Sequence, residues 1–198
     1  MKRARSQKVG ILGGTFNPIH LGHLLIAQDA MEQAQLDRVV FIPAASPAHK
    51  NAAGLVSARH RLHMVKLAVR GDDRFIMDDI EIRRGGKSYA VDTVTELKCR
   101  WPHAKLFFII GADSLQELHL WRDIGRLAAQ CTFLVLPRPG CERKRPRLRQ
   151  SIRLRMVRGH LCDIASRDVR ARIARGQSIR YLVTDAVLNY IERKKLYR

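Results

Sequence analysis

The stretch VGILGGTFNPIHLGH, residues 9–23, joins an apolar run to two glycines, a proline and two histidines. Its first part, Val9–Leu12, has the aliphatic and β-branched composition of a buried strand. Gly13 and Gly14 permit a sharp turn and carry no side chain that would hold a ligand away from the backbone amides. A helix predicted to begin near Leu21 points its positive end at the same space. The stretch therefore predicts a strand, an anion-binding loop and a helix in succession.

Two imidazoles belong to the same loop. His20 and His23 stand three residues apart, so on the first helical turn their side chains share one face. Imidazoles can hydrogen-bond to phosphate oxygens in either protonation state, and a nearby phosphate favours the charged form. Thr15 and Asn17 add polar groups that can face an anion. An isolated histidine pair is more often an ordinary surface feature, but the full combination after a strand favours a phosphate site.

Further strand-like runs occur at Arg38–Ile42, Arg74–Met77, Leu106–Ile110 and Thr132–Leu136. Segments with helical spacing lie between them, at Leu21–Gln35, Ser57–Arg70 and Val91–Arg100. This alternation predicts an α/β fold, with a Rossmann-like, doubly wound and mostly parallel sheet covered on both faces. Ligands bind such sheets beyond the carboxyl ends of the strands, where the strand order reverses.

The strand pattern stops after residues 137–140, and the remainder is predicted to be helical. Helices are expected near Ser166–Arg175 and Asp185–Lys195. We therefore expect a single domain over residues 1–198, with a Rossmann-like core over 1–140 and a helical C-terminal part over 141–198.

The chain of 198 residues has 37 Lys and Arg against 18 Asp and Glu, a formal net charge of +19. This excess predicts affinity for polyanions, from phosphorylated metabolites to RNA. No uncharged apolar run approaches the roughly 20 residues that cross a bilayer, and no cleavage signal follows the basic first residues. We expect a cytoplasmic protein with no membrane partner. The cysteines are Cys99, Cys131, Cys141 and Cys162. They show no paired spacing, so they are expected to be reduced thiols, and no metal-binding cage is evident.

The loop at residues 13–23, GGTFNPIHLGH, resembles the G-G-[ST]-F-[DN]-P-x-H-x-G-H signature of nucleotidylyltransferases, and specifically of bacterial nicotinate-nucleotide adenylyltransferases. The resemblance continues in FIPAASPAHK (41–50), RGGKSYAVDT (84–93), IIGADSLQELHLW (109–121), RPG (138–140) and YLVTDAVLNYIERKKLY (181–197). It implies adenylyl transfer from ATP to nicotinate mononucleotide, giving nicotinate adenine dinucleotide and pyrophosphate, in NAD biosynthesis. Mg²⁺ would arrive with ATP, since it binds chiefly to phosphates.

The resemblance also implies site residues. Catalysis is assigned to His20, His23, Lys50 and Arg170. ATP binding is assigned to Gly13, Gly14, Thr15, Phe16, His20, His23, Gly111, Asp113, Ser166 and Arg170. Binding of nicotinate mononucleotide is assigned to Thr15, Lys50, Ser88, Tyr89, Ala90, Trp121, Arg122 and Arg138. In this scheme Asp113 binds ribose hydroxyls; the alternative is that it caps the helix near Ser114, and the two roles can coexist. Trp121 stacks on the pyridine ring, and backbone amides near Ser88 hold the ring carboxylate.

The chain departs from the family pattern at three places. Ala48 replaces the second proline of a P-P-H-K segment, and Ala90 stands where threonine is common. In residues 164–170, which resemble I-S-S-T-x-x-R, Ala165 and Arg167 replace two hydroxyl residues. Arg167 either replaces the lost donors by a charge-assisted contact or points to solvent, leaving ATP more weakly held.

The implied reaction needs no protein nucleophile, because the attacking phosphate oxygen is already ionised. Catalysis is expected from in-line positioning and from cations and amides that stabilise charge on the leaving pyrophosphate. Alternatives are a related adenylyltransferase that uses nicotinamide mononucleotide or pantetheine phosphate, or a basic nucleic-acid-binding protein on the same scaffold. The last is supported by the net charge and the arginine-rich stretch 142–158, which lacks interleaved aromatic residues. The sequence leaves the ring preference and any homo-oligomer open.

Overall fold

The computed structural model describes residues 6–47, 54–137, 139–140 and 151–198. These residues form a six-stranded parallel sheet in the order β4-β2-β1-β6-β7-β8. The strands are β1 (Lys8–Gly14), β2 (Arg38–Pro43), β4 (Phe75–Met77), β6 (Lys105–Gly111), β7 (Cys131–Leu136) and β8 (Leu154–Met156). A small separate sheet pairs β3 (Ser46–Pro47) with β5 (Lys87–Ser88).

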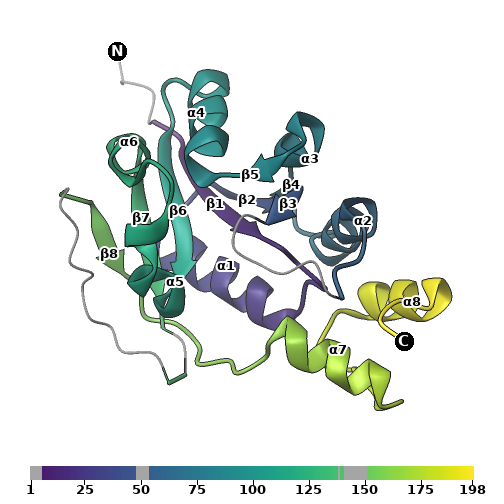
Figure 1. The fold of residues 1–198 in the computed structure, drawn as a ribbon. Coiled ribbons are helices and arrows are strands. Elements are labelled where there is room, and N and C mark those ends of the chain that lie inside the picture. The colour runs from purple at the N-terminus through teal and green to yellow at the C-terminus, as the bar shows by residue number, and fades with distance from the viewer. Residues whose placement is uncertain (1–5, 48–53, 138, 141–150) are drawn as a thin grey trace.

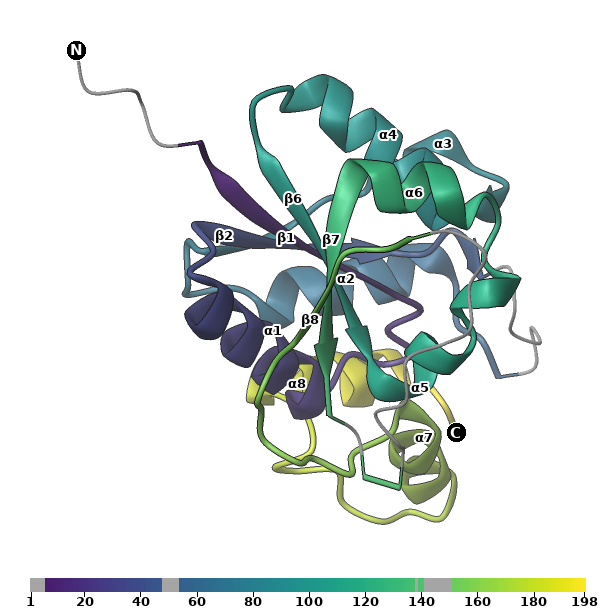
Figure 2. The same ribbon diagram turned by 90° about the vertical axis from the view of Figure 1, so that its left-hand side faces the viewer.

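Helices cover both faces of the main sheet (Figure 1). Helices of one layer are α1 (Leu21–Ala34), α2 (Ala58–Ala68), α7 (Ser166–Ala174) and α8 (Asp185–Lys194). Those of the other layer are α3 (Ile80–Arg84), α4 (Ala90–Arg100), α5 (Ala112–Gln116) and α6 (Ile124–Gln130), with a 3-10 turn at Leu118–Leu120. Figure 2 shows α4 and α6 on one side of the strands and α1 and α8 on the other.

The central strands β1, β2, β6 and β7 are predominantly apolar, as expected for strands that are buried on both faces. In β2, Val39 and Phe41 belong to the core cluster under α1 and α2, while Val40 and Ile42 belong to the cluster under α4 and α6. All four side chains are fully buried. The expected α/β, Rossmann-like, mostly parallel sheet is therefore confirmed, and each strand and helix expected from the sequence is present.

One expectation about the C-terminal part was wrong. Strand β8 lies after residue 140, where the strand pattern was expected to have ended, and pairs in parallel with β7. Its sequence, Leu154-Arg155-Met156, carries no run of apolar residues because an edge strand is paired and buried only in part. The segment assigned to a helical part thus contributes to the core sheet. The division of the chain into 1–140 and 141–198 stays a prediction. Residues 141–150, which include most of the arginine-rich stretch 142–158, lie outside the described residues.

The order of the sheet locates the crevice. After β1 the chain builds β2 and β4 on one side, and it then returns to place β6 on the other side of β1. The direction of winding therefore reverses between β1 and β6, whose carboxyl ends are at Gly14 and Gly111. A reversal of this kind opens a ligand crevice in parallel sheets. Within the described segments, every helix is too short or too polar to cross a bilayer.

Candidate active site

The first loop, residues 15–20, leaves β1 at Gly14 and enters α1 at Leu21. Phe16 adopts a left-handed backbone with φ of 49°, and its side chain is only 2% exposed. Its ring packs edge-on against His23, with centroids 5.0 Å apart. The Phe16 side chain is therefore part of the core rather than of an ATP-binding surface. Only its backbone is left to contact a nucleotide.

The two histidines lie together, as their spacing predicts. Their ring centroids are 3.7 Å apart, and His20 is the N-cap residue of α1. The backbone N–H of His20 donates to Nδ1 of His23 across 3.2 Å. Because Nδ1 accepts this bond, a neutral His23 ring carries its proton on Nε2, which is then a donor. The first turn of α1 contains no acidic residue that would offset its positive end.

Asn17 has a different role from the one expected. Its side chain is buried rather than facing an anion. The amide Nδ2 donates to the carbonyl of Gly54 at 2.9 Å, and Oδ1 accepts from the backbone N–H of Val56 at 3.3 Å. The Tyr197 hydroxyl also donates to Oδ1, at 3.0 Å. Burial raises the pKa of Tyr197 well above its usual range, so the hydroxyl keeps its proton. Asn17 thus joins the first loop to two distant segments.

The start of α7 packs against the backbone of the same loop. The Ser166 hydroxyl donates to the carbonyl of Pro18 at 2.9 Å, and Nη1 of Arg170 donates to the carbonyl of Asn17 at 2.8 Å. Two residues expected to bind ATP phosphates therefore also hold the loop in place. Arg167, which replaces a threonine of the family pattern, has an 84% exposed side chain that pairs with the neighbouring Asp168 at 3.3 Å.

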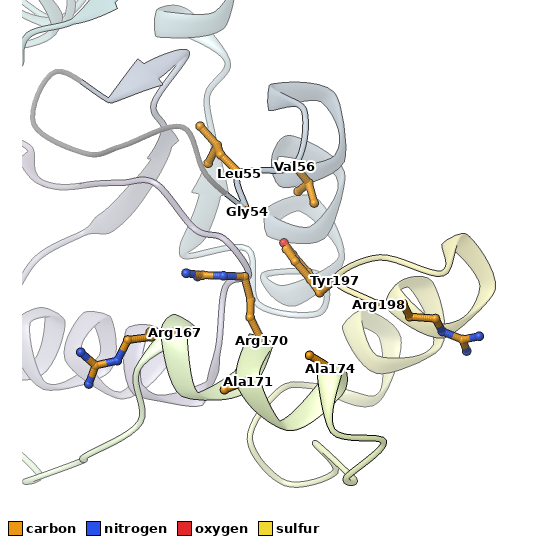
Figure 3. A pocket seen from close by; sticks show the side chains of 9 residues that line it. All are labelled: Gly54, Leu55, Val56, Arg167, Arg170, Ala171, Ala174, Tyr197 and Arg198. Atoms are coloured by element: carbon orange, nitrogen blue, oxygen red, sulfur yellow. The ribbon is translucent and has the colours of Figure 1, made fainter.

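A cavity of about 530 Å³ lies between Gly54–Val56, the exposed face of α7 and the last two residues of the chain (Figure 3). Arg167, Arg170 and Arg198 line it together with Tyr197. In Figure 3 the guanidinium groups of Arg167 and Arg170 extend to the same side, whereas that of Arg198 extends to the opposite side. The cavity is therefore a positively charged space beside the first loop.

The segment 85–90 carries three of the residues expected to bind the pyridine nucleotide, Ser88, Tyr89 and Ala90. Gly85 and Gly86 have φ of 72° and 68°, a left-handed backbone that glycine adopts readily. The turn leads into β5, where the Ser88 hydroxyl accepts from the backbone N–H of Ala45 at 2.9 Å. Ala90 then begins α4, with Tyr89 as its N-cap residue.

Two of the residues assigned to the pyridine nucleotide are in direct contact. The guanidinium carbon of Arg122 lies 4.5 Å from the centre of the Tyr89 ring, in a cation–π arrangement. Trp121 is half-buried, and its ring packs edge-on against Phe108 at 5.7 Å and Phe133 at 6.5 Å between centroids. The core thus supports Trp121, and the tertiary structure brings Tyr89 and Arg122 together.

Gly111 ends β6 and is itself the N-cap of α5, with Asp113 in the first turn. The alternative in which Asp113 caps this helix is therefore wrong. A Cβ atom on residue 111 would lie 2.5 Å from Oδ1 of Asp113. A side chain at residue 111 would therefore require the Asp113 carboxylate to move away from the end of the strand.

Two of the assigned residues, Lys50 and Arg138, lie outside the described residues. In the part of the chain that the structure describes, no group of three or more His, Cys, Asp or Glu residues could hold a metal ion.

Sequence reasoning missed Arg61, which is 1% exposed in α2. A signal was available, because Arg61 stands three and four residues before Met64 and Val65, on the apolar face of a predicted helix.

The chain is similar to known proteins along nearly its whole length. Residues 11–172 match the family model described as Cytidylyltransferase-like. A relative from Citrifermentans bemidjiense is 44% identical, covering 96% of this chain and 98% of its own. One from Exiguobacterium sibiricum is 45% identical with the same coverage. Both are named "Probable nicotinate-nucleotide adenylyltransferase".

A solved structure of similar fold is the Plasmodium falciparum nicotinic acid mononucleotide adenylyltransferase complexed with NaAD. It has a TM-score of 0.79 at 16% identity and covers 96% of this chain and 97% of its own. A second structure, of the same Plasmodium falciparum enzyme complexed with APC, has a TM-score of 0.77 at 15% identity, with equal coverage. These two show the fold, and the much closer curated relatives show the family. The chain therefore belongs to the nicotinate-nucleotide adenylyltransferase family and is a nucleotidyltransferase enzyme.

Proposed function

We propose that the protein transfers the adenylyl group of ATP to nicotinate mononucleotide, forming nicotinate adenine dinucleotide and pyrophosphate. The observation that carries this proposal is the close pair His20 and His23 at the N-terminus of α1, where the sheet reverses its winding. Family membership supplies the choice of substrates.

The site acts on phosphate by positioning and by charge. The attacking phosphate oxygen of the acceptor is ionised at neutral pH, so the protein need not remove a proton. Nε2–H of His23 donates to an oxygen of the α-phosphate as charge builds there, and the positive end of α1 adds to this effect. Arg170 and Lys50 stabilise charge on the leaving pyrophosphate. Mg²⁺ enters as part of the substrate MgATP.

The acceptor nucleotide occupies the wall formed by the segment 85–90 and the residues after β6. Backbone amides near Ser88 hold the ring carboxylate, and Trp121 stacks on the pyridine ring. Tyr89 and Arg122 form one contact pair, and in this proposal the guanidinium of Arg122 supplies positive charge to the acidic ring. This arrangement favours nicotinate over nicotinamide mononucleotide, and we propose that the reaction takes place in the cytoplasm.

The test is release of pyrophosphate from MgATP in the presence of nicotinate mononucleotide, nicotinamide mononucleotide or pantetheine phosphate. We expect rapid release with the first substrate and far slower release with the other two. Equal rates with both pyridine nucleotides would contradict the ring preference. Absence of release with all three, from a folded protein, would refute the proposed function.

A further inference from the structure

Arg61 is a buried arginine whose side-chain hydrogen bonds, among the residues that the structure describes, all go to backbone carbonyls. Its side chain is on α2 and is 1% exposed. Nη1 donates to the carbonyl of Thr15 at 2.8 Å, Nη2 to that of Ala45 at 3.0 Å and Nε to that of Val56 at 3.2 Å. The described part of the chain contains no ion pair of Arg61 with a carboxylate. Burial lowers the pKa of the guanidinium, but an arginine of this kind still carries its charge.

The three carbonyls belong to three different loops. Thr15 is in the first loop, Ala45 lies between β2 and β3, and Val56 precedes α2. Ala45 is held from its other side as well, because its N–H donates to the hydroxyl of Ser88. One planar group therefore joins the ATP side of the site to the wall proposed for the acceptor nucleotide.

Holding a carbonyl also orients the next amide. A peptide group is planar and trans, so the N–H of the following residue points opposite to the carbonyl. The bond from Arg61 to Thr15 thus sets the direction of the Phe16 N–H, a backbone donor in the loop that would bind phosphate. Phe16 has a left-handed backbone that needs such support from its surroundings.

The buried positive charge of Arg61 also supports a role in holding the loops. Burying a cation without a carboxylate partner is costly, and an apolar side chain would fill a core position at a lower cost. The three carbonyl bonds offset part of that cost only while all three loops keep their arrangement. The burial of the Arg61 guanidinium is therefore favourable only while the three loops of the site keep their arrangement.

We propose that Arg61 is a positioning residue, which holds the backbone of these three loops so that ATP and the acceptor nucleotide meet in the reactive arrangement. The expected effect of Arg61 on kcat rests on the proposed function, whereas its effect on the backbone of the three loops does not.

The test compares Arg61→Lys with a control on the same helix, Val65→Ala. Lysine keeps the charge, but its ammonium is a single point that cannot span three carbonyls. Val65 is fully buried in the core cluster, so its truncation lowers stability without removing a loop contact. Hydrogen exchange of the protein without substrates is measured on peptides that cover residues 13–17, 44–47 and 54–57, with β7 as the internal reference.

We expect Arg61→Lys to lose protection in all three loops while β7 stays protected. At saturating substrates its kcat should fall about 100-fold, the usual size of an effect from slight misplacement of reacting groups. Val65→Ala should unfold at a lower temperature yet keep its loop protection and its kcat. In Arg61→Ala, added guanidinium ions should restore loop protection and kcat, whereas ammonium ions at the same concentration should not.

Wild-type protection of the three loops in a folded Arg61→Lys variant would overturn the proposal. So would a loss of kcat that Val65→Ala shares, because the effect would then follow from stability alone. If Arg61→Lys does not fold, the experiment with guanidinium ions and Arg61→Ala tests the proposal. A positioning role requires that loop protection and kcat recover in that experiment. If the wild-type protein transfers no adenylyl group, the proposed function fails, while the exchange experiment still tests the role of Arg61.

Discussion

The two nitrogens of the His23 ring have separate roles that two substitutions can separate. Nδ1 accepts from the backbone N–H of His20 at the start of α1, and Nε2–H is the proposed donor to phosphate. In His23→Asn, the amide oxygen takes the place of Nδ1, while the donor at Nε2 is lost. In His23→Ala, both are lost.

The two losses differ in size and in the quantity that reports them: the capping contact affects the melting temperature, and the phosphate donor affects kcat. Loss of a helix-capping contact costs about 1 kcal/mol, which lowers the melting temperature of a domain of this size by about 2–4 °C. The contact is half-buried and 3.2 Å long, which favours the lower part of that range. Loss of a preorganised donor to a reacting oxyanion lowers kcat by about 10²–10³.

We therefore expect both variants to lose the same factor in kcat, measured by pyrophosphate release at saturating substrates. Only His23→Ala should also melt earlier, measured by circular dichroism. A His23→Asn variant with near wild-type kcat would refute the role of Nε2. A His23→Ala variant that melts like the wild-type protein would refute the capping role of Nδ1.

Two further predictions concern buried titratable groups. Burial raises the pKa of Glu81 above its usual 4.5. The folded protein therefore keeps the proton of this carboxyl group at a pH where the unfolded chain has released it. The free energy of unfolding should then fall as the pH rises above about 4.5. Glu81→Gln should lack this part of the pH dependence in urea unfolding at pH 5 and pH 7, and an equal difference from wild type at both values would contradict the prediction. Burial also raises the pKa of Cys131 to about 12. Iodoacetamide at pH 8 should therefore modify the exposed Cys99 and leave Cys131 unmodified in the native protein. Peptide mass spectrometry measures the labelling, and equal labelling of the two cysteines would contradict the prediction.

Much of the fold was predictable because its signals are local. Strands β1, β2, β6 and β7 are apolar runs followed by turn residues, and α1 begins at a recognisable capping loop. The edge strand β8 was not predictable, because its polar sequence lacks the apolar pattern of the buried strands and depends on pairing with β7. The short helices α3, α5 and α6 have too few turns to show a clear period.

The sequence by itself determined the order of the elements, the chemistry of the first loop and, through several motifs, the family. Neighbouring residues suffice for these, since periodicity and turn chemistry act over a few positions. Only the tertiary structure decided that Asn17 and Arg61 hold loops together rather than face a ligand or solvent. Their partners are remote in the chain: Tyr197 lies 180 residues from Asn17, and Thr15 lies 46 residues from Arg61. A buried polar side chain must find its hydrogen bonds wherever the fold supplies them, and those partners exist only once the sheet and its helices are assembled.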